Sequence, residues 1–125
     1  MSEPCPIIVN VKTEYSAEHS EPDQEHFVFI YYVSIKNRGE QAAQLISRHW
    51  IITDGDDQTQ EVRGDGVIGE QPVLEPGDEH YYNSFCVLST RVGCMQGSYM
   101  MLGEDGLYFD APIPAFSLAA PGSLN

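Results

Sequence analysis

Basic residues are scarce in this chain of 125 residues. Six lysines and arginines stand against 19 aspartates and glutamates, which gives a net charge of −13. Such a charge repels polyanions, so neither nucleic acid nor an anionic membrane surface is an expected partner. A cationic partner or a metal ion fits the charge better, although plain solubility explains it more simply.

Cysteine is scarce as well. The three cysteines, Cys5, Cys86 and Cys94, are odd in number and form no Cys-x-x-Cys pair. This favours reduced thiols in a cytoplasm over a disulfide framework, a zinc site or a redox motif. Residues 27–33 form the longest strongly apolar run, which is too short to span a membrane, and the N-terminus lacks a secretory signal. We therefore expect a soluble, cytoplasmic protein.

Helical periodicity is absent, and the dominant period is two. Residues 27–35 place aromatic and β-branched side chains on one face and are largely apolar on the other, which predicts a strand in the middle of a sheet. Residues 7–15 alternate between apolar and polar side chains, which predicts a strand with one face in water. Further strands are expected at 44–54, 58–63, 80–85, 98–102, 107–110 and 113–118.

These strands imply one domain over residues 1–125, with its core at about 7–118. We expect irregular segments at 16–24, 64–78 and 89–97, and a loose tail from residue 119. About seven to eight short strands predict an all-β, antiparallel two-sheet sandwich of the immunoglobulin or fibronectin type III kind.

Residues 64–69 read G-x-G-x-x-G, a pattern that can cradle phosphate with backbone amides. That use needs a helix after the glycines, whereas Gly69 is followed by Glu70, Gln71 and Pro72. A loop that needs positive φ at its glycines is the favoured interpretation, and phosphate binding is the alternative.

Two other clusters contain residues able to carry chemistry. Asp54, Asp56, Asp57 and Glu61 could present oxygen ligands to Ca²⁺ or Mg²⁺, but they fit no EF-hand and are also ordinary turn residues. Ser84, Cys86 and Ser89 lack a nucleophile elbow. We expect no cofactor, no metal site and no enzymatic activity.

Arg48, His49 and Trp50 offer hydrogen-bond donors and an aromatic plane to a binding groove. On a strand, however, alternate side chains point to opposite faces, which would bury Trp50 in the core. Together with the glycine segment they define a candidate binding face: Arg48, His49, Trp50, Arg63, Gly64, Gly66, Gly69, Glu70 and Gln71.

The sequence of residues 47–77, SRHWIITDGDDQTQEVRGDGVIGEQPVLEPG, resembles the ApaG family of bacterial proteins. The Leu88-Ser89-Thr90 triplet, the spaced run from Gly93 to Met101 and the segment IPAFSL at 113–118 extend the resemblance from about Val9 to Leu118. It implies a fibronectin-III-like sandwich, an association with cobalt and magnesium efflux or resistance, and no established catalytic residues. Related domains fused within eukaryotic F-box and polymerase-interacting proteins imply a protein-interaction role.

The chain departs from the family pattern at Asp65, where many relatives have proline. It also departs at Phe85, Val87 and Arg91, where glycine and prolines are common, which leaves the conformation of residues 85–93 open. We expect a module that binds another protein, with a weak homo-oligomer as a further form of association. A small-ligand or phosphate sensor at residues 64–69 and direct divalent-metal binding are the alternatives.

Overall fold

In the computed structural model, which describes residues 5–122, the chain is all-β. The strands are β1 (Ile7–Tyr15), β2 (Phe27–Asn37), β3 (Ala43–Asp54), β4 (Thr59–Asp65), β5 (Val73–Leu74), β6 (Glu79–Leu88), β7 (Val92–Gly103) and β8 (Tyr108–Ala119). One turn of 3₁₀ helix, η1 (Pro22–Gln24), interrupts the loop between β1 and β2. Among the described residues no helix is long and apolar enough to cross a membrane.

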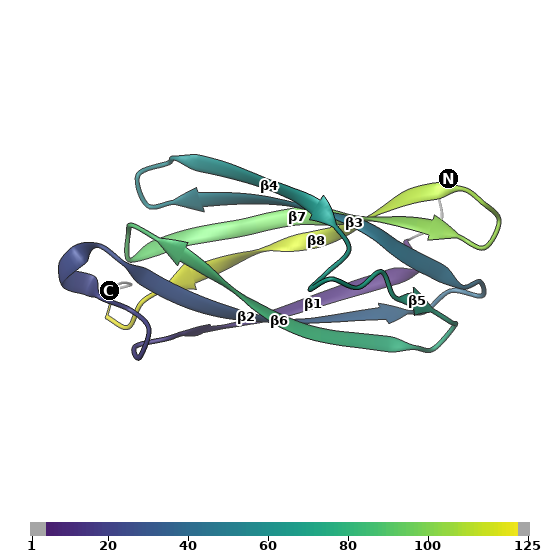
Figure 1. Cartoon of the computed structure of the whole chain (residues 1–125), viewed down its shortest axis with the longest axis horizontal. Helices are drawn as coiled ribbons and strands as arrows, with labels where there is room; N and C mark the ends of the chain where they lie inside the picture. Colours follow the sequence, from purple (N-terminus) through teal and green to yellow (C-terminus); the bar gives the residue numbers. More distant parts are fainter. Residues whose placement is uncertain (1–4, 123–125) are drawn as a thin grey trace.

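The strands form two antiparallel sheets that face each other as the layers of a sandwich (Figure 1). One sheet has the order β1-β2-β6, and the other has the order β4-β3-β7-β8 with β5 paired to β3. On one side of the sandwich β1 packs against β8, whereas β4 and β6, the edges of the other side, approach each other less closely. The sandwich predicted from the sequence is therefore confirmed, and one of its sides is more open than the other.

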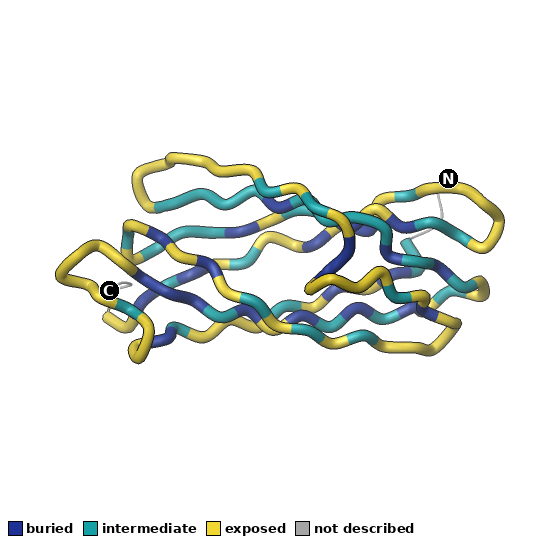
Figure 2. Tube along the Cα trace, in the orientation of Figure 1, coloured by how far each residue is buried: buried dark blue, intermediate teal, exposed yellow. Residues whose placement is uncertain are grey.

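Strand alternation fills the space between the sheets. The predicted central strand is β2, which lies between β1 and β6 and buries Phe29 and Ile35 almost completely. An aromatic cluster links the layers, because the ring of Trp50 on β3 lies 5.4 Å from Tyr31 on β2 and 5.9 Å from Phe116 on β8. Edge-to-face pairs of this kind add about 0.5–1.5 kcal/mol each to the burial of the rings. In Figure 2 the buried segments lie mostly along the middle of the strands, and the loops at both ends are exposed.

Asn37 fixes one end of the sandwich. Its side chain is fully buried at the end of β2. The amide Nδ2 donates to the carbonyl oxygens of Gln41 and Leu74, each at 2.9 Å, and Oδ1 accepts from the backbone N–H of Gly39 at 2.8 Å. A single buried amide therefore joins the turn after β2 to β5, and its polar atoms are satisfied as burial requires.

The prediction of an irregular segment at 89–97 is wrong, because β7 already begins at Val92. Gly97 lies opposite Trp50 within this strand, and a Cβ atom there would collide with the carbonyl oxygen of His49. Glycine thus allows close approach of β3, next to a bulge between Met95 and Gly97.

The strands expected at 107–110 and 113–118 are in fact one strand, β8, which runs through Pro112 and Pro114. Proline is tolerated there because β8 is an edge strand, where a missing N–H breaks no pairing on the outer side. The tail also begins later than residue 119, since Ala120 is buried and its N–H donates to the carbonyl of Arg91 at 2.9 Å. Residues 1–4 and 123–125 lie outside the described part of the chain.

Candidate functional site

Strand alternation divides the Arg-His-Trp run between two faces. His49 points outward from β3, whereas Trp50 is only 2% exposed and packs in the aromatic core. The inclusion of Trp50 in an exposed binding face is therefore wrong, and its expected core position is confirmed. The aromatic plane is not offered to a partner at the surface.

Arg48 is held by the glycine segment. Its Nη1 atom donates to the carbonyl oxygens of Asp65 at 3.1 Å and Gly66 at 3.0 Å. Gly64 lies directly opposite Arg48 on β4, and a Cβ atom at this position would come within 2.7 Å of Arg48 Nη2. Gly64 thus makes room for a guanidinium group of the chain itself.

Of the other two glycines, Gly69 lies within a tight turn and Gly66 stands just before it. Val67 and Glu70 exchange two backbone hydrogen bonds of 2.8 and 3.0 Å, and the residues between them, Ile68 and Gly69, have φ values of +47° and +74°. Positive φ at both central positions is typical of a two-residue type I′ turn. Gly66, with φ of +62°, donates its N–H to the carbonyl of Ile46 at 2.8 Å. The N–H groups of Gly66, Val67 and Glu70 are therefore already bonded to carbonyls.

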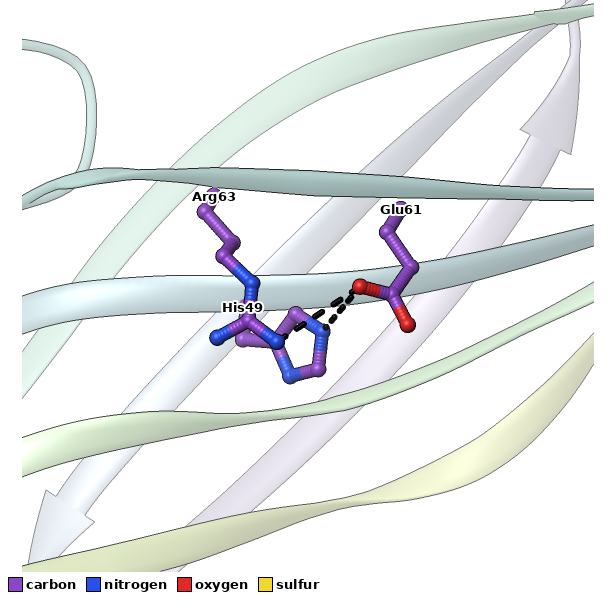
Figure 3. Close-up of polar contacts among 3 residues, drawn as sticks. All are labelled: His49, Glu61 and Arg63. Atoms are coloured by element: carbon purple, nitrogen blue, oxygen red, sulfur yellow. Dashed lines mark hydrogen bonds and ion pairs between the residues drawn. The ribbon is translucent and has the colours of Figure 1, made fainter.

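His49, Glu61 and Arg63 lie together on the outer face of the larger sheet (Figure 3). Oε2 of Glu61 is 3.5 Å from His49 Nε2 and 3.5 Å from Arg63 Nη2. His49 Nε2 is buried, and its contact with Glu61 lacks the geometry of a hydrogen bond. Because Arg63 and Glu61 are largely exposed, we expect each pair to contribute at most about 1 kcal/mol.

The remaining two members of the predicted face have different roles. Oε2 of the exposed Glu70 lies 3.9 Å from Nε2 of the half-buried His80 on β6, a contact that becomes an ion pair when His80 is protonated. Gln71 donates its Nε2 to the carbonyl of Ile46 at 2.9 Å, beside the bulge in β3. Gln71 therefore supports the backbone of β3.

A shallow hollow on the outer face brings some predicted residues together. It has a volume of about 430 Å³ and is lined by Ser47, Arg48, His49, Arg63, Gly64, Asp65, Ser98, Met100 and Asp110. Trp50, Gly66, Gly69, Glu70 and Gln71 do not line it. Basic side chains in the hollow are balanced by two aspartates, so the hollow has mixed charge.

A cluster of tyrosines between the sheets was not singled out from the sequence. The hydroxyl groups of Tyr82 on β6 and Tyr99 on β7 form a hydrogen bond from one sheet to the other. Burial raises the pKa of both hydroxyls and that of Tyr31, and the nearby Arg48 offsets part of each shift. Alternation along the segment 80–88 could have indicated that Tyr82 points into the core. It could not have identified Tyr99 as its partner, because the segment does not show which strand lies opposite.

The thiol of Cys86 is also buried between the sheets. Burial raises its pKa to about 11. A thiol of this kind stays protonated at neutral pH and is a poor nucleophile. Cys86 therefore behaves as a small apolar side chain.

In the acidic turn between β3 and β4, the carboxylate of Asp54 is occupied by hydrogen bonds within the turn. Asp54 Oδ1 accepts the N–H groups of Asp56 at 2.8 Å and Gln58 at 3.0 Å, which is the geometry of an Asx turn. Within residues 5–122, no three side chains of histidine, cysteine, aspartate or glutamate gather as a metal site.

Comparison with known proteins gives a consistent result. The family model described as the ApaG domain matches residues 17–103. The chain is 62% identical over 119 residues to Protein ApaG of Pseudomonas paraeruginosa, covering 95% of this chain and 94% of that one. It is 57% identical to Protein ApaG of Azotobacter vinelandii over the whole of both chains, 126 aligned residues. The crystal structure of the putative ApaA protein from Bordetella pertussis superposes with a TM-score of 0.91 at 50% identity, covering 93% of this chain and 94% of that one.

Proposed function

Because the chain belongs to the ApaG domain family, we propose that it is a non-enzymatic binding module of the cytoplasm whose partner is another protein. One observation carries the proposal, namely the exposed apolar surface of β6. This strand forms the edge of the smaller sheet. Tyr81, Phe85 and Val87 point outward from it and are 68%, 67% and 42% exposed.

The surface continues only in part onto the neighbouring strand. Phe85 lies opposite Ile30 on β2, which is half-buried, whereas Val87 lies opposite Val28, which is buried. An edge strand with free backbone groups and adjacent apolar side chains is a template for pairing with another chain, and proteins usually protect such edges. Exposed apolar patches of this kind mark interaction sites.

The partner that fits this surface is an extended segment of another protein, paired along β6 as an added strand. Its backbone would hydrogen-bond to the open edge, and its apolar side chains would cover Phe85 and Val87. Because the chain has a net charge of −13, we expect the segment or its flanks to be basic. A second copy of the chain carries the same negative charge and is the weaker candidate.

We further propose that the family's association with cobalt and magnesium resistance acts through such a partner. Direct ion binding at the cluster of Asp54, Asp56, Asp57 and Glu61 is the competing explanation, and Asp54 already caps its own turn. Calorimetric titration of the protein with Co²⁺ and Mg²⁺ separates the two. Binding heat that disappears on joint replacement of Asp56 and Asp57 by alanine would support direct binding.

Partner capture tests the protein-binding role. Immobilised wild-type protein is compared in native lysate with Phe85→Lys and with Leu107→Lys, which adds the same charge at an equally exposed position (67%) on the far hairpin. We expect proteins that bind to the wild type and to Leu107→Lys but not to Phe85→Lys. Equal recovery by all three baits, or no recovery above background, would contradict the proposal.

A small anion such as pyrophosphate is the second candidate. The outer hollow favours it, because Arg48, His49 and Arg63 all line this space. NMR titration with pyrophosphate should then shift the amide signals of His49 and Arg63. Unchanged signals at millimolar ligand would exclude this use of the hollow.

A further inference from the structure

The open side of the sandwich contains a second cleft, which lies between β4 and β6 and has Arg48 in common with the outer hollow. Its volume is about 360 Å³, within the range of about 300–1,000 Å³ that is common for small-molecule sites. Side chains from β2, β3, β4, β6 and β7 line it. The cleft therefore enters the core between the two sheets, unlike the hollow on the outer face.

Apolar residues are the majority in the lining of the cleft, and Tyr31, Gln60 and Ser84 add polar groups beside Arg48. Trp50, Met95 and Val62 of the larger sheet lie on one side, and the exposed residues Phe85 and Val87 belong to the rim at the edge of β6. A mainly apolar lining with a few placed polar groups is the usual composition of a small-ligand site.

Arg48 is the one charged side chain among the described residues that line the cleft, and no carboxylate accompanies it. This is unexpected in a chain with 19 acidic and six basic residues. Within residues 5–122, Arg48 forms no ion pair, and its hydrogen bonds are the two that Nη1 donates to carbonyls. Those bonds and Gly64 hold the guanidinium in place, while Nε and Nη2 remain as donors.

A half-buried guanidinium without a carboxylate partner is a binding group for an anion. The apolar lining selects a ligand with a hydrocarbon body, and the negative charge of the chain disfavours multiply charged phosphates. We propose that this cleft binds a small carboxylate with an apolar body, of the class of a medium-chain fatty acid. The carboxylate pairs with Arg48, and the hydrocarbon packs against Trp50 and Met95.

The only tryptophan of the chain reports on the cleft, so titration with octanoate below its micellar concentration can be followed by Trp50 fluorescence. We expect a saturable change in emission, and about tenfold weaker binding of octanol, which has the same chain but no charge. Arg48→Gln should weaken octanoate binding about tenfold and leave octanol binding unchanged.

Arg63→Gln is the matched control, since it removes the same charge at a 70% exposed position that does not line the cleft. It should bind octanoate as the wild type does. If Arg48→Gln fails to fold, Arg48→Lys keeps the charge and should retain most of the preference for octanoate over octanol.

Three results would overturn the proposal: no saturable response of the wild type to octanoate, equal affinity for octanoate and octanol, or equal losses in the Arg48 and Arg63 variants. The titration involves no protein partner, so its outcome is independent of the role proposed for the outer surface of β6.

Discussion

The hydrogen bond between Tyr82 and Tyr99 gives the sharpest stability prediction. Tyr99 is 0% exposed, and among residues 5–122 the Tyr82 hydroxyl is the one group that hydrogen-bonds to the Tyr99 hydroxyl. Tyr82→Phe removes one oxygen from a half-buried ring and leaves the Tyr99 hydroxyl buried without a partner. An unsatisfied buried polar group costs about 1–3 kcal/mol, so we expect the free energy of unfolding to fall by roughly 2 kcal/mol.

The reverse substitution should cost less. Tyr99→Phe leaves the Tyr82 hydroxyl unpaired, but Tyr82 is less buried than Tyr99, so its unpaired hydroxyl should cost less. We expect a loss of about 0.5–1.5 kcal/mol, the usual net value of one hydrogen bond. The double variant removes both polar atoms and should be no less stable than Tyr82→Phe alone.

Urea unfolding followed by Trp50 fluorescence measures all four proteins of this cycle. The slope of the free energy against urea concentration should stay constant if only stability changes. Additive losses in the double variant would refute the reasoning, because they would mean that the two hydroxyls do not depend on each other.

Three further predictions concern single positions. Ile68 is an exposed β-branched residue with φ of +47°, a backbone conformation that asparagine adopts more easily. Ile68→Asn should therefore raise the free energy of unfolding by about 1 kcal/mol, measured by urea unfolding. Gly97→Ala should cost more than about 3 kcal/mol in the same assay, since the methyl group meets the carbonyl oxygen of His49. Cys86, whose pKa burial raises to about 11 from 9.0, should react with iodoacetamide at pH 8 far more slowly than Cys5 and Cys94. The pKa of the Cys86 thiol is higher in the folded state than in the unfolded state. The stability that the protonated thiol contributes is therefore complete below pH 9 and is lost as the pH rises through about 11. Unfolding measured over a series of alkaline pH values can detect this loss.

The strands with strong alternation could be predicted because their pattern is local. The segment 27–35 has apolar residues on both faces, and it became the central strand of its sheet. The prediction began the strand β7 only at residue 98, after Gly97, and divided β8 at Pro112. Whether glycine ends a strand or admits a neighbouring backbone depends on the pairing of distant segments, as Gly97 and His49 show. Likewise, β5 has only two residues and exists through its pairing with Ala43 and Gln44.

The face around residues 48–50 was assembled from neighbours in sequence, and a strand separates such neighbours. Arg48 and Trp50 point toward the other sheet, whereas His49 meets Glu61 and Arg63 outside. The apolar surface of β6 was missed for a related reason. Phe85 and Val87 look like ordinary strand residues, and only the order of strands shows that they lie at an open edge.

The pairing of Arg48 with Gly64, in contrast, follows from the hairpin turn that the sequence does predict. In the structure the turn places Thr53 opposite Thr59, and each step back along β3 matches one step forward along β4. Five steps bring Arg48 opposite Gly64. A bare glycine opposite a long cationic side chain leaves a space into which that side chain can fold. The strand register thus explains Gly64, the first glycine of the G-x-G-x-x-G pattern. If the protein binds an anion, the guanidinium of Arg48, which Gly64 accommodates, is a better site for it than the glycine segment.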